Sequence, residues 1–134
     1  MQFKEALKAA GLPNPGRTTW SGVTPEGVPV FTIWQHEIHQ VSGRWFAWWS
    51  HGGSRDSTGE LVPSRKAHAK AFVQRATENL GSRCRAVIVT PRFGKQGEVS
   101  VEHAEYPHEI WSTVVFRTTD MDALQFIAEL LPAE

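Results

Sequence analysis

The stretch RWFAWWSH, residues 44–51, decides what kind of fold this sequence predicts. Its many aromatic residues are typical of a β-strand, in which successive side chains point to opposite faces of a sheet. Trp45 and Trp49 would then lie on one face, and Phe46 and Trp48 on the other. A sheet with one face in water carries its apolar side chains mainly on the other face. The stretch therefore predicts a sheet that is covered on both sides, or one whose aromatic face is exposed for a partner.

Further strand candidates lie on both sides of this stretch, rich in Val, Ile, Phe, Thr or Trp and bounded by turn residues. They cover residues 17–23, 28–38, 84–90, 98–104 and 110–118. The Ser42-Gly43 pair predicts a hairpin that leads into residues 44–51, and residues 52–62 are interpreted as a polar loop. Because neighbouring strands are joined by short turns, we expect a mostly antiparallel sheet.

Apolar residues at helical spacing predict two helices, over residues 2–10 and 64–80. Phe72, Ala76 and Leu80 would line one face of the second helix, which therefore packs against the sheet.

A third helix is predicted to begin at Asp120, because Leu124, Ile127 and Leu131 also recur at helical spacing. The resulting element order is α-βββα-βββα. We therefore expect an α+β fold with a mostly antiparallel sheet and about three helices, formed by a single domain over residues 1–134. The expected core consists of Phe72, Leu80, Val87, Val89, Val114, Phe116, Leu124 and Ile127.

The composition is that of an ordinary globular domain with balanced charge. The chain has 134 residues, with 14 Lys and Arg residues and 14 Asp and Glu residues. Zero net charge argues against a histone-like polyanion binder but is compatible with a local basic patch. The single cysteine, Cys84, excludes an intramolecular disulfide, and the first residues lack the apolar core of a signal peptide. We therefore expect a cytoplasmic protein.

The six tryptophans are the most unusual feature of the composition, since tryptophan is favoured both in cores and at binding surfaces. Basic residues also cluster between positions 55 and 95, which indicates a side that faces phosphates. This cluster consists of Arg55, Arg65, Lys66, Lys70, Arg75, Arg83, Arg85, Arg92 and Lys95. The predicted binding surface combines Arg44, Trp45, Trp48, Trp49, His51, Arg55, Arg65, Lys66 and Lys70. At least one of its three tryptophans is expected to be exposed beside an arginine.

We interpret the protein as a small non-enzymatic binding module. Its ligand would be nucleic acid, including one with an exposed or modified base, or a nucleic-acid-associated protein. Neither a cofactor nor a membrane partner is expected, and a homodimer is compatible with the sequence. Small α+β modules of this style are common among nucleic-acid readers and phage-type accessory proteins, but no family motif is recognisable.

The alternative function is a small hydrolase or nuclease, with or without a metal, that uses His36, His39, His51 or His103. The first two are three residues apart, whereas the zincin motif places its histidines four apart on a helix, so no bound metal is expected. The enzyme alternative requires at least two histidines and a carboxylate to meet in one concave pocket.

Cys84 lies between Arg83 and Arg85, and cations beside a thiol lower its pKa. In a strand, however, the two arginine side chains point away from the face that carries the cysteine. We therefore expect a buried cysteine rather than a reactive one.

Overall fold

The structure, a computed structural model, describes residues 1–16, 19–50, 54–55, 61–62, 67–120 and 125–133. Its helical elements are α1 (Phe3–Ala9), the 3-10 turn η1 (Gln35–Glu37) and α2 (Ala67–Glu78). The strands are β1 (Ser21–Val23), β2 (Pro29–Trp34), β3 (Ile38–Val41), β4 (Arg44–Ser50), β5 (Ser54–Arg55), β6 (Leu61–Val62), β7 (Cys84–Phe93), β8 (Val99–Glu105), β9 (Thr113–Asp120) and β10 (Gln125–Leu131). In the described part, no helix is long and apolar enough to cross a membrane.

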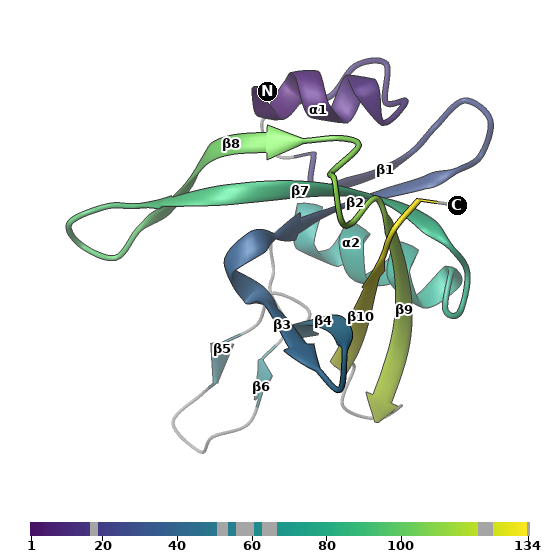
Figure 1. Cartoon of the computed structure of the whole chain (residues 1–134), viewed down its shortest axis with the longest axis vertical. Helices are drawn as coiled ribbons and strands as arrows, with labels where there is room; N and C mark the ends of the chain where they lie inside the picture. Colours follow the sequence, from purple (N-terminus) through teal and green to yellow (C-terminus); the bar gives the residue numbers. More distant parts are fainter. Residues whose placement is uncertain (17–18, 51–53, 56–60, 63–66, 121–124, 134) are drawn as a thin grey trace.

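Eight strands form one mixed sheet in the order β1-β2-β7-β9-β10-β4-β3, with β8 paired to β7. β2 and β7 run parallel, and the other described pairs are antiparallel. The expected α+β class with a mostly antiparallel sheet is thus confirmed. β2 and β3 are joined by η1, yet they lie toward opposite ends of the strand order. The sheet therefore curls on itself, with α2 packed against it (Figure 1).

The third helix predicted from Asp120 is wrong, because Gln125–Leu131 forms strand β10 between β9 and β4. The edges of β9 and β4 that face this segment both carry backbone N–H and C=O groups that need partners. As a strand, β10 forms backbone hydrogen bonds with both neighbours at once. The segment also suits a strand, since Ala128 and Leu130 point into the core while Glu129 points to the opposite face. Tertiary context therefore overrode the helical spacing.

The remaining elements follow the predicted order with two further corrections. The expected strand over residues 28–38 is interrupted by η1, because the chain must turn from the β7 side of the sheet to the β4 side. The expected loop over residues 52–62 contains the short strands β5 and β6, which pair with each other. The element order therefore departs from α-βββα-βββα, and the described helices are two α-helices and the 3-10 turn.

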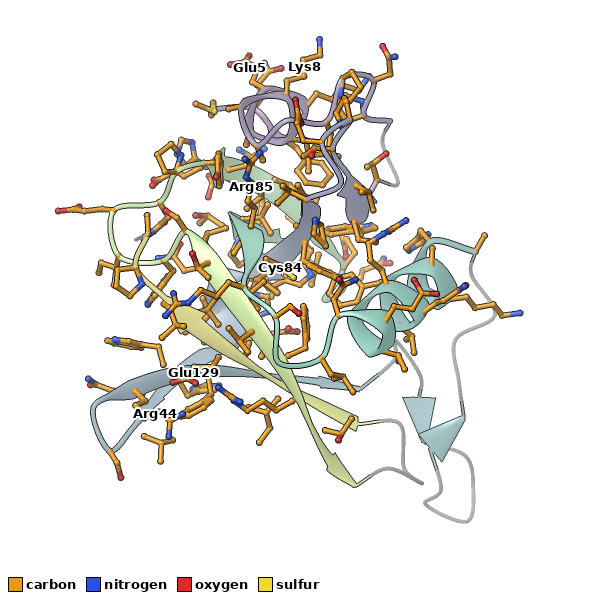
Figure 2. All side chains as sticks on the ribbon, turned by 90° about the vertical axis from the view of Figure 1, so that its right-hand side faces the viewer. Glu5, Lys8, Arg44, Cys84, Arg85 and Glu129 are labelled. Atoms are coloured by element: carbon orange, nitrogen blue, oxygen red, sulfur yellow. The ribbon has the colours of Figure 1, made fainter. Side chains whose placement is uncertain are left out.

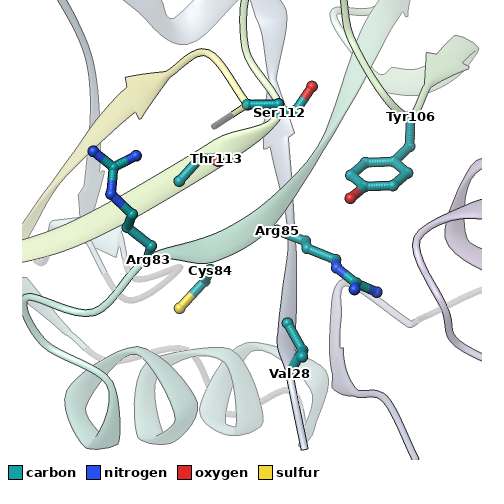
Figure 3. Close-up of a pocket in the computed structure, with 8 residues that line it drawn as sticks. Val28, Arg83, Cys84, Arg85, Tyr106, Ser112 and Thr113 are labelled. Atoms are coloured by element: carbon teal, nitrogen blue, oxygen red, sulfur yellow. The ribbon is translucent and has the colours of Figure 1, made fainter. Parts of the chain in front are cut away.

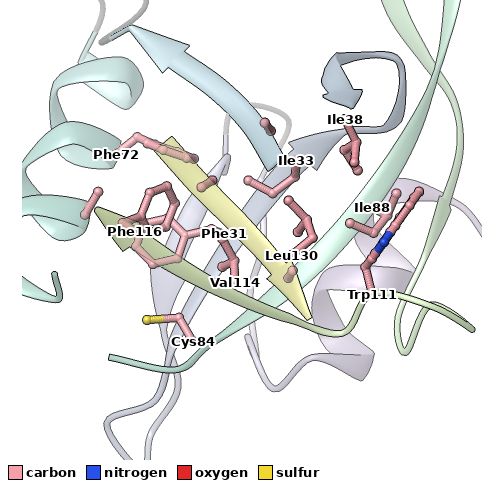
Figure 4. Packing of buried hydrophobic residues seen from close by; sticks show 14 residues of the cluster. Phe31, Ile33, Ile38, Phe72, Cys84, Ile88, Trp111, Val114, Phe116 and Leu130 are labelled. Atoms are coloured by element: carbon pink, nitrogen blue, oxygen red, sulfur yellow. The ribbon is translucent and has the colours of Figure 1, made fainter. Parts of the chain in front are cut away.

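Hydrophobic side chains cover both faces of the central strands. Phe31 and Ile33 of β2 belong to a core cluster with Phe72 of α2, as Figure 4 shows, whereas Val30 belongs to a second cluster beneath α1. Phe116 completes the first cluster, with its ring centroid 4.5 Å from that of Phe31. Both faces of β2 are therefore covered, which is one of the two alternatives that the sequence left open for the sheet.

Most of the expected core is buried. Phe72, Val87, Val89, Val114 and Phe116 are buried. Leu80 and Ile127 are only partly buried. Leu124 lies outside the described residues.

Candidate functional site

Arg44, the first residue of the predicted binding surface, is held by a buried carboxylate. Its Nε lies 2.7 Å from Oε2 of Glu129, and its Nη2 lies 2.8 Å from Oε1. The hydrogen bonds from Arg44 hold the pKa of Glu129 below its usual range, and Arg117 acts in the same direction. The Arg44 guanidinium also lies 5.1 Å from the ring centroid of Phe46. This arginine is therefore oriented by the protein and its charge is already balanced.

Trp45 points to the opposite face of β4, as strand alternation predicts. It is partly buried against the first core cluster, and its ring centroid lies 5.3 Å from that of Trp111 in an edge-to-face arrangement. Because Arg44 contacts Glu129 on the outer face, the structure does not bring Arg44 and Trp45 into one surface.

The other residues of the predicted surface are only partly described. Lys70 is exposed on α2. The side chains of Trp48, Trp49 and Arg55, and the whole of His51, Arg65 and Lys66, lie outside the described residues.

A different set of aromatic side chains forms a continuous row on the described surface. It runs through Phe3, Trp20, Trp34, His36 and Phe93, with consecutive ring centroids 5.3, 5.3, 5.5 and 5.3 Å apart. The first three rings pack against the second core cluster, whereas Phe93 is 59% exposed. The row therefore extends from partly buried rings at the second core cluster to the exposed ring of Phe93.

Backbone and side-chain hydrogen bonds hold this row in place. The backbone N–H of Thr32 donates to the carbonyl oxygen of Trp20, with 2.9 Å between the two atoms. On the other side, the hydroxyl of Thr90 on β7 donates to Oε1 of Gln35 at 2.9 Å, which ties η1 to β7. His36 follows Gln35, and its ring lies edge-on to that of Phe93 at the end of β7.

Two arginines of the basic cluster that the sequence indicated are close in sequence to members of the row. Arg75 of α2 donates a hydrogen bond to the hydroxyl of Ser21, the residue after Trp20. Arg92 directly precedes Phe93 on β7, so its side chain extends from the opposite face of the strand, where it pairs with Glu102 at 3.4 Å.

The histidine pair at positions 36 and 39 does not form a metal centre with its neighbours. His36 stacks edge-on between Trp34 and Phe93, and His39 is exposed on β3. Burial raises the pKa of Glu37 between them, while the two histidines act in the opposite direction. Among the described residues, no group of three His, Cys, Asp or Glu side chains has a geometry that could hold a metal ion.

A second pair of histidines flanks a carboxylate. Nε2 of His103 lies 3.3 Å from Oε1 of Glu105, and Nε2 of His108 lies 3.8 Å from Oε2. The other ring nitrogen of His108 accepts a hydrogen bond from the Ile110 N–H at 3.1 Å, which leaves Nε2 as the donor toward Glu105 in the neutral ring. Two histidines and a carboxylate are thus adjacent, whereas the enzyme alternative requires them to meet in a concave pocket. None of the three is among the described residues that line a pocket of about 420 Å³ at the start of β7, beside Arg83 and Arg85 (Figure 3).

Cys84 is buried in the first core cluster, as predicted from strand alternation. Burial raises the pKa of its thiol to about 11. At neutral pH the group is therefore a thiol and not a nucleophilic thiolate.

Sequence reasoning missed the aromatic row because its members come from four separate segments: α1, the residue before β1, the junction of β2 and η1, and the end of β7. The high tryptophan content was a signal that such a surface exists, but it carried no information on which rings meet. Comparison with protein-family models, curated proteins and solved structures finds no match to this chain.

Proposed function

We propose that this protein is a non-enzymatic binding module for nucleic acid that presents an exposed base. The observation that carries this proposal is the row of five rings that leads from the core edge to Phe93, which is 59% exposed. An aromatic ring that remains in water on an otherwise well-packed domain is a ready stacking partner for a base.

The row provides an oriented stacking surface at little entropic cost. His36 packs edge-on against Phe93 at an interplanar angle of 81°, so the phenyl ring is supported from one side while its exposed part faces solvent. Stacking of one base on an aromatic side chain contributes about 1–3 kcal/mol.

The proposal is tested by fluorescence anisotropy with labelled single-stranded DNA and RNA oligonucleotides and with the matching duplexes. We expect single strands to bind more tightly, and Phe93→Ala to weaken their binding roughly tenfold or more, the effect of about 1.4 kcal/mol. Ile110→Ala is the matched control, because Ile110 is a large apolar residue that is 47% exposed away from the row. Absence of binding to every oligonucleotide, or an equal loss in both variants, would contradict the proposal.

A small hydrolase or nuclease is the second candidate function, favoured by the position of Glu105 between His103 and His108. The same oligonucleotides test it when they are incubated with the protein and separated on a denaturing gel. Cleavage that disappears in both His103→Gln and His108→Gln would favour the enzyme, whereas intact oligonucleotides favour the binding module.

A further inference from the structure

The strands β3, β4, β10 and β9 have an outer face on which neither described α-helix packs. α2 covers their inner face, because its Phe72 ring packs on Phe116 of β9, and α1 contacts β7 and β8. Figure 2 shows the Arg44–Glu129 pair on the side of these strands away from both helices. Strand register places the following described side chains on the outer face: His39, Val41, Arg44, Phe46, Thr113, Val115, Arg117, Ile127, Glu129 and Leu131.

Apolar side chains form a large part of this outer face. Val41 is 57% exposed, and Phe46, Ile127 and Leu131 are partly exposed. A sheet face in contact with water normally carries polar side chains, whereas an apolar face is normally buried against a second layer. Neighbouring apolar side chains that stay exposed mark interaction sites. The outer face therefore has the character of a surface that a partner covers.

Two arginines lie over one carboxylate on this face. Nη2 of Arg44 and Nη2 of Arg117 contact the same oxygen of Glu129, Oε1, at 2.8 and 3.5 Å. The arginine side chains are 57% and 54% exposed, whereas that of Glu129 is 6% exposed, so the guanidinium groups form the outer layer. Among the described side chains of the face, Glu129 is the single acidic one and balances one of the two charges. One positive charge is therefore left uncompensated at the surface.

The geometry favours a protein partner over nucleic acid on this face. The Arg44 guanidinium lies 5.1 Å from the ring centroid of Phe46 and covers the ring that a base would need for stacking. One uncompensated charge also gains little from a polyanion, since nucleic-acid backbones are bound through several phosphate contacts. The cores of protein interfaces, by contrast, are enriched in arginine and aromatic residues and poor in lysine and acidic residues. The outer face has this composition.

We infer that the outer face binds an amphipathic helix of a partner protein, with the apolar stripe of that helix on Val41, Ile127 and Leu131 and an acidic residue bound by Arg117. A guanidinium has five N–H donors, and the contact with Glu129 leaves donors of Arg117 for a second carboxylate. A helix is about 10 Å wide and four paired strands span about 14 Å, so one helix covers most of the face. Binding here does not depend on the aromatic row.

The inference is tested by NMR titration of the ¹⁵N-labelled protein with a synthetic peptide of about 15 residues, held helical by a side-chain staple. The peptide carries leucine at every third or fourth position and glutamate beside this leucine stripe. We expect it to shift the amide signals of residues 44–46, 115–117 and 127–131. The same peptide with lysine in place of glutamate should bind at least about tenfold more weakly, because its charge repels Arg44 and Arg117.

Variants with matched controls separate this face from the rest of the surface. Arg117→Gln should weaken peptide binding about fivefold or more, whereas Arg92→Gln should not, because Arg92 is an exposed arginine in a comparable pair with Glu102 at 3.4 Å. Val41→Ser should also weaken binding. Val99→Ser is its control, because Val99 is 44% exposed on β8, outside the outer face.

Several outcomes would overturn the inference. These are the absence of amide shifts on the outer face at millimolar peptide, equal binding of the glutamate and lysine peptides, and equal losses in Arg117→Gln and Arg92→Gln. A single-stranded oligonucleotide that shifts the same amides and displaces the peptide would assign the face to nucleic acid instead. Phe93→Ala should leave peptide binding unchanged, so failure of this inference is distinguishable from failure of the stacking proposal.

Discussion

Arg44 on β4 and Glu129 on β10 form a two-pronged ion pair, with both nitrogen–oxygen distances below 3 Å. Glu129 is only 4% exposed although it lies on the outer face of the sheet, while Arg44 extends over it toward solvent. Arg117 on β9 approaches the same carboxylate at 3.5 Å. Figure 2 shows the Arg44–Glu129 pair on the side of the molecule opposite α1. These three side chains therefore connect the neighbouring strands β9, β10 and β4.

Removal of the carboxylate charge should destabilise the protein in a pH-dependent way. The hydrogen bonds from Arg44 lower the pKa of Glu129 in the folded state, so the pair stabilises the fold above the ordinary carboxyl pKa of about 4.3. This contribution is lost as the pH falls through the lowered value, because the folded protein must then take up the proton. Urea unfolding should show a lower stability for Glu129→Gln at pH 7, and the difference from the original protein should shrink toward pH 3.

The control for this experiment is Glu102→Gln. Glu102 pairs with Arg92 at 3.4 Å, but both side chains are largely exposed, and such pairs contribute little to stability. If Glu102→Gln lowered the free energy of unfolding as much as Glu129→Gln does, the burial and two-pronged geometry of the Arg44–Glu129 pair would not be the source of its stabilising effect.

Phe72 should be among the most costly residues to truncate. Its side chain is 3% exposed and its ring packs edge-on against Phe31 and Phe116, with centroids 5.1 and 5.7 Å away. Phe72→Ala should lower the free energy of unfolding by about 3–5 kcal/mol, because it leaves a cavity between α2 and the sheet. Lys70→Ala, at an exposed position of the same helix, should leave stability nearly unchanged. A loss below about 1 kcal/mol for Phe72→Ala would mean that α2 packs through another face.

Cys84 should be nearly inert in the folded protein. Burial raises its pKa to about 11, whereas an unfolded thiol titrates near 8.5. At pH 8 the native thiolate population is therefore smaller by at least about a hundredfold, and the core limits access as well. A thiol-reactive chromogenic disulfide should label the protein slowly in buffer and rapidly in urea. Stoichiometric labelling within seconds in buffer would contradict the buried position.

The sequence predicted α1, α2, β4, β7 and β9 well, because each has one clear periodicity or clear turn residues at its ends. It failed at Gln125–Leu131, where apolar residues satisfy both helical and alternating spacing. The choice depended on the backbone edges of β9 and β4, which sequence reasoning could not place beside this segment. The periodicity of a segment therefore predicts its secondary structure reliably only where no neighbouring strand edge can pair with that segment.

The residues of the candidate site also divide into features that the sequence predicted and features that depend on the tertiary structure. The sequence by itself determined that Arg44 and Trp45 point to opposite faces, and that Cys84 points away from Arg83 and Arg85, since alternation is a property of every strand backbone. Only the tertiary structure decided that Trp45 packs inward on Trp111 and that separate segments assemble the aromatic row and the pocket. The physical reason is that facing direction depends on adjacent residues, whereas proximity between distant residues depends on how the whole sheet curls and pairs.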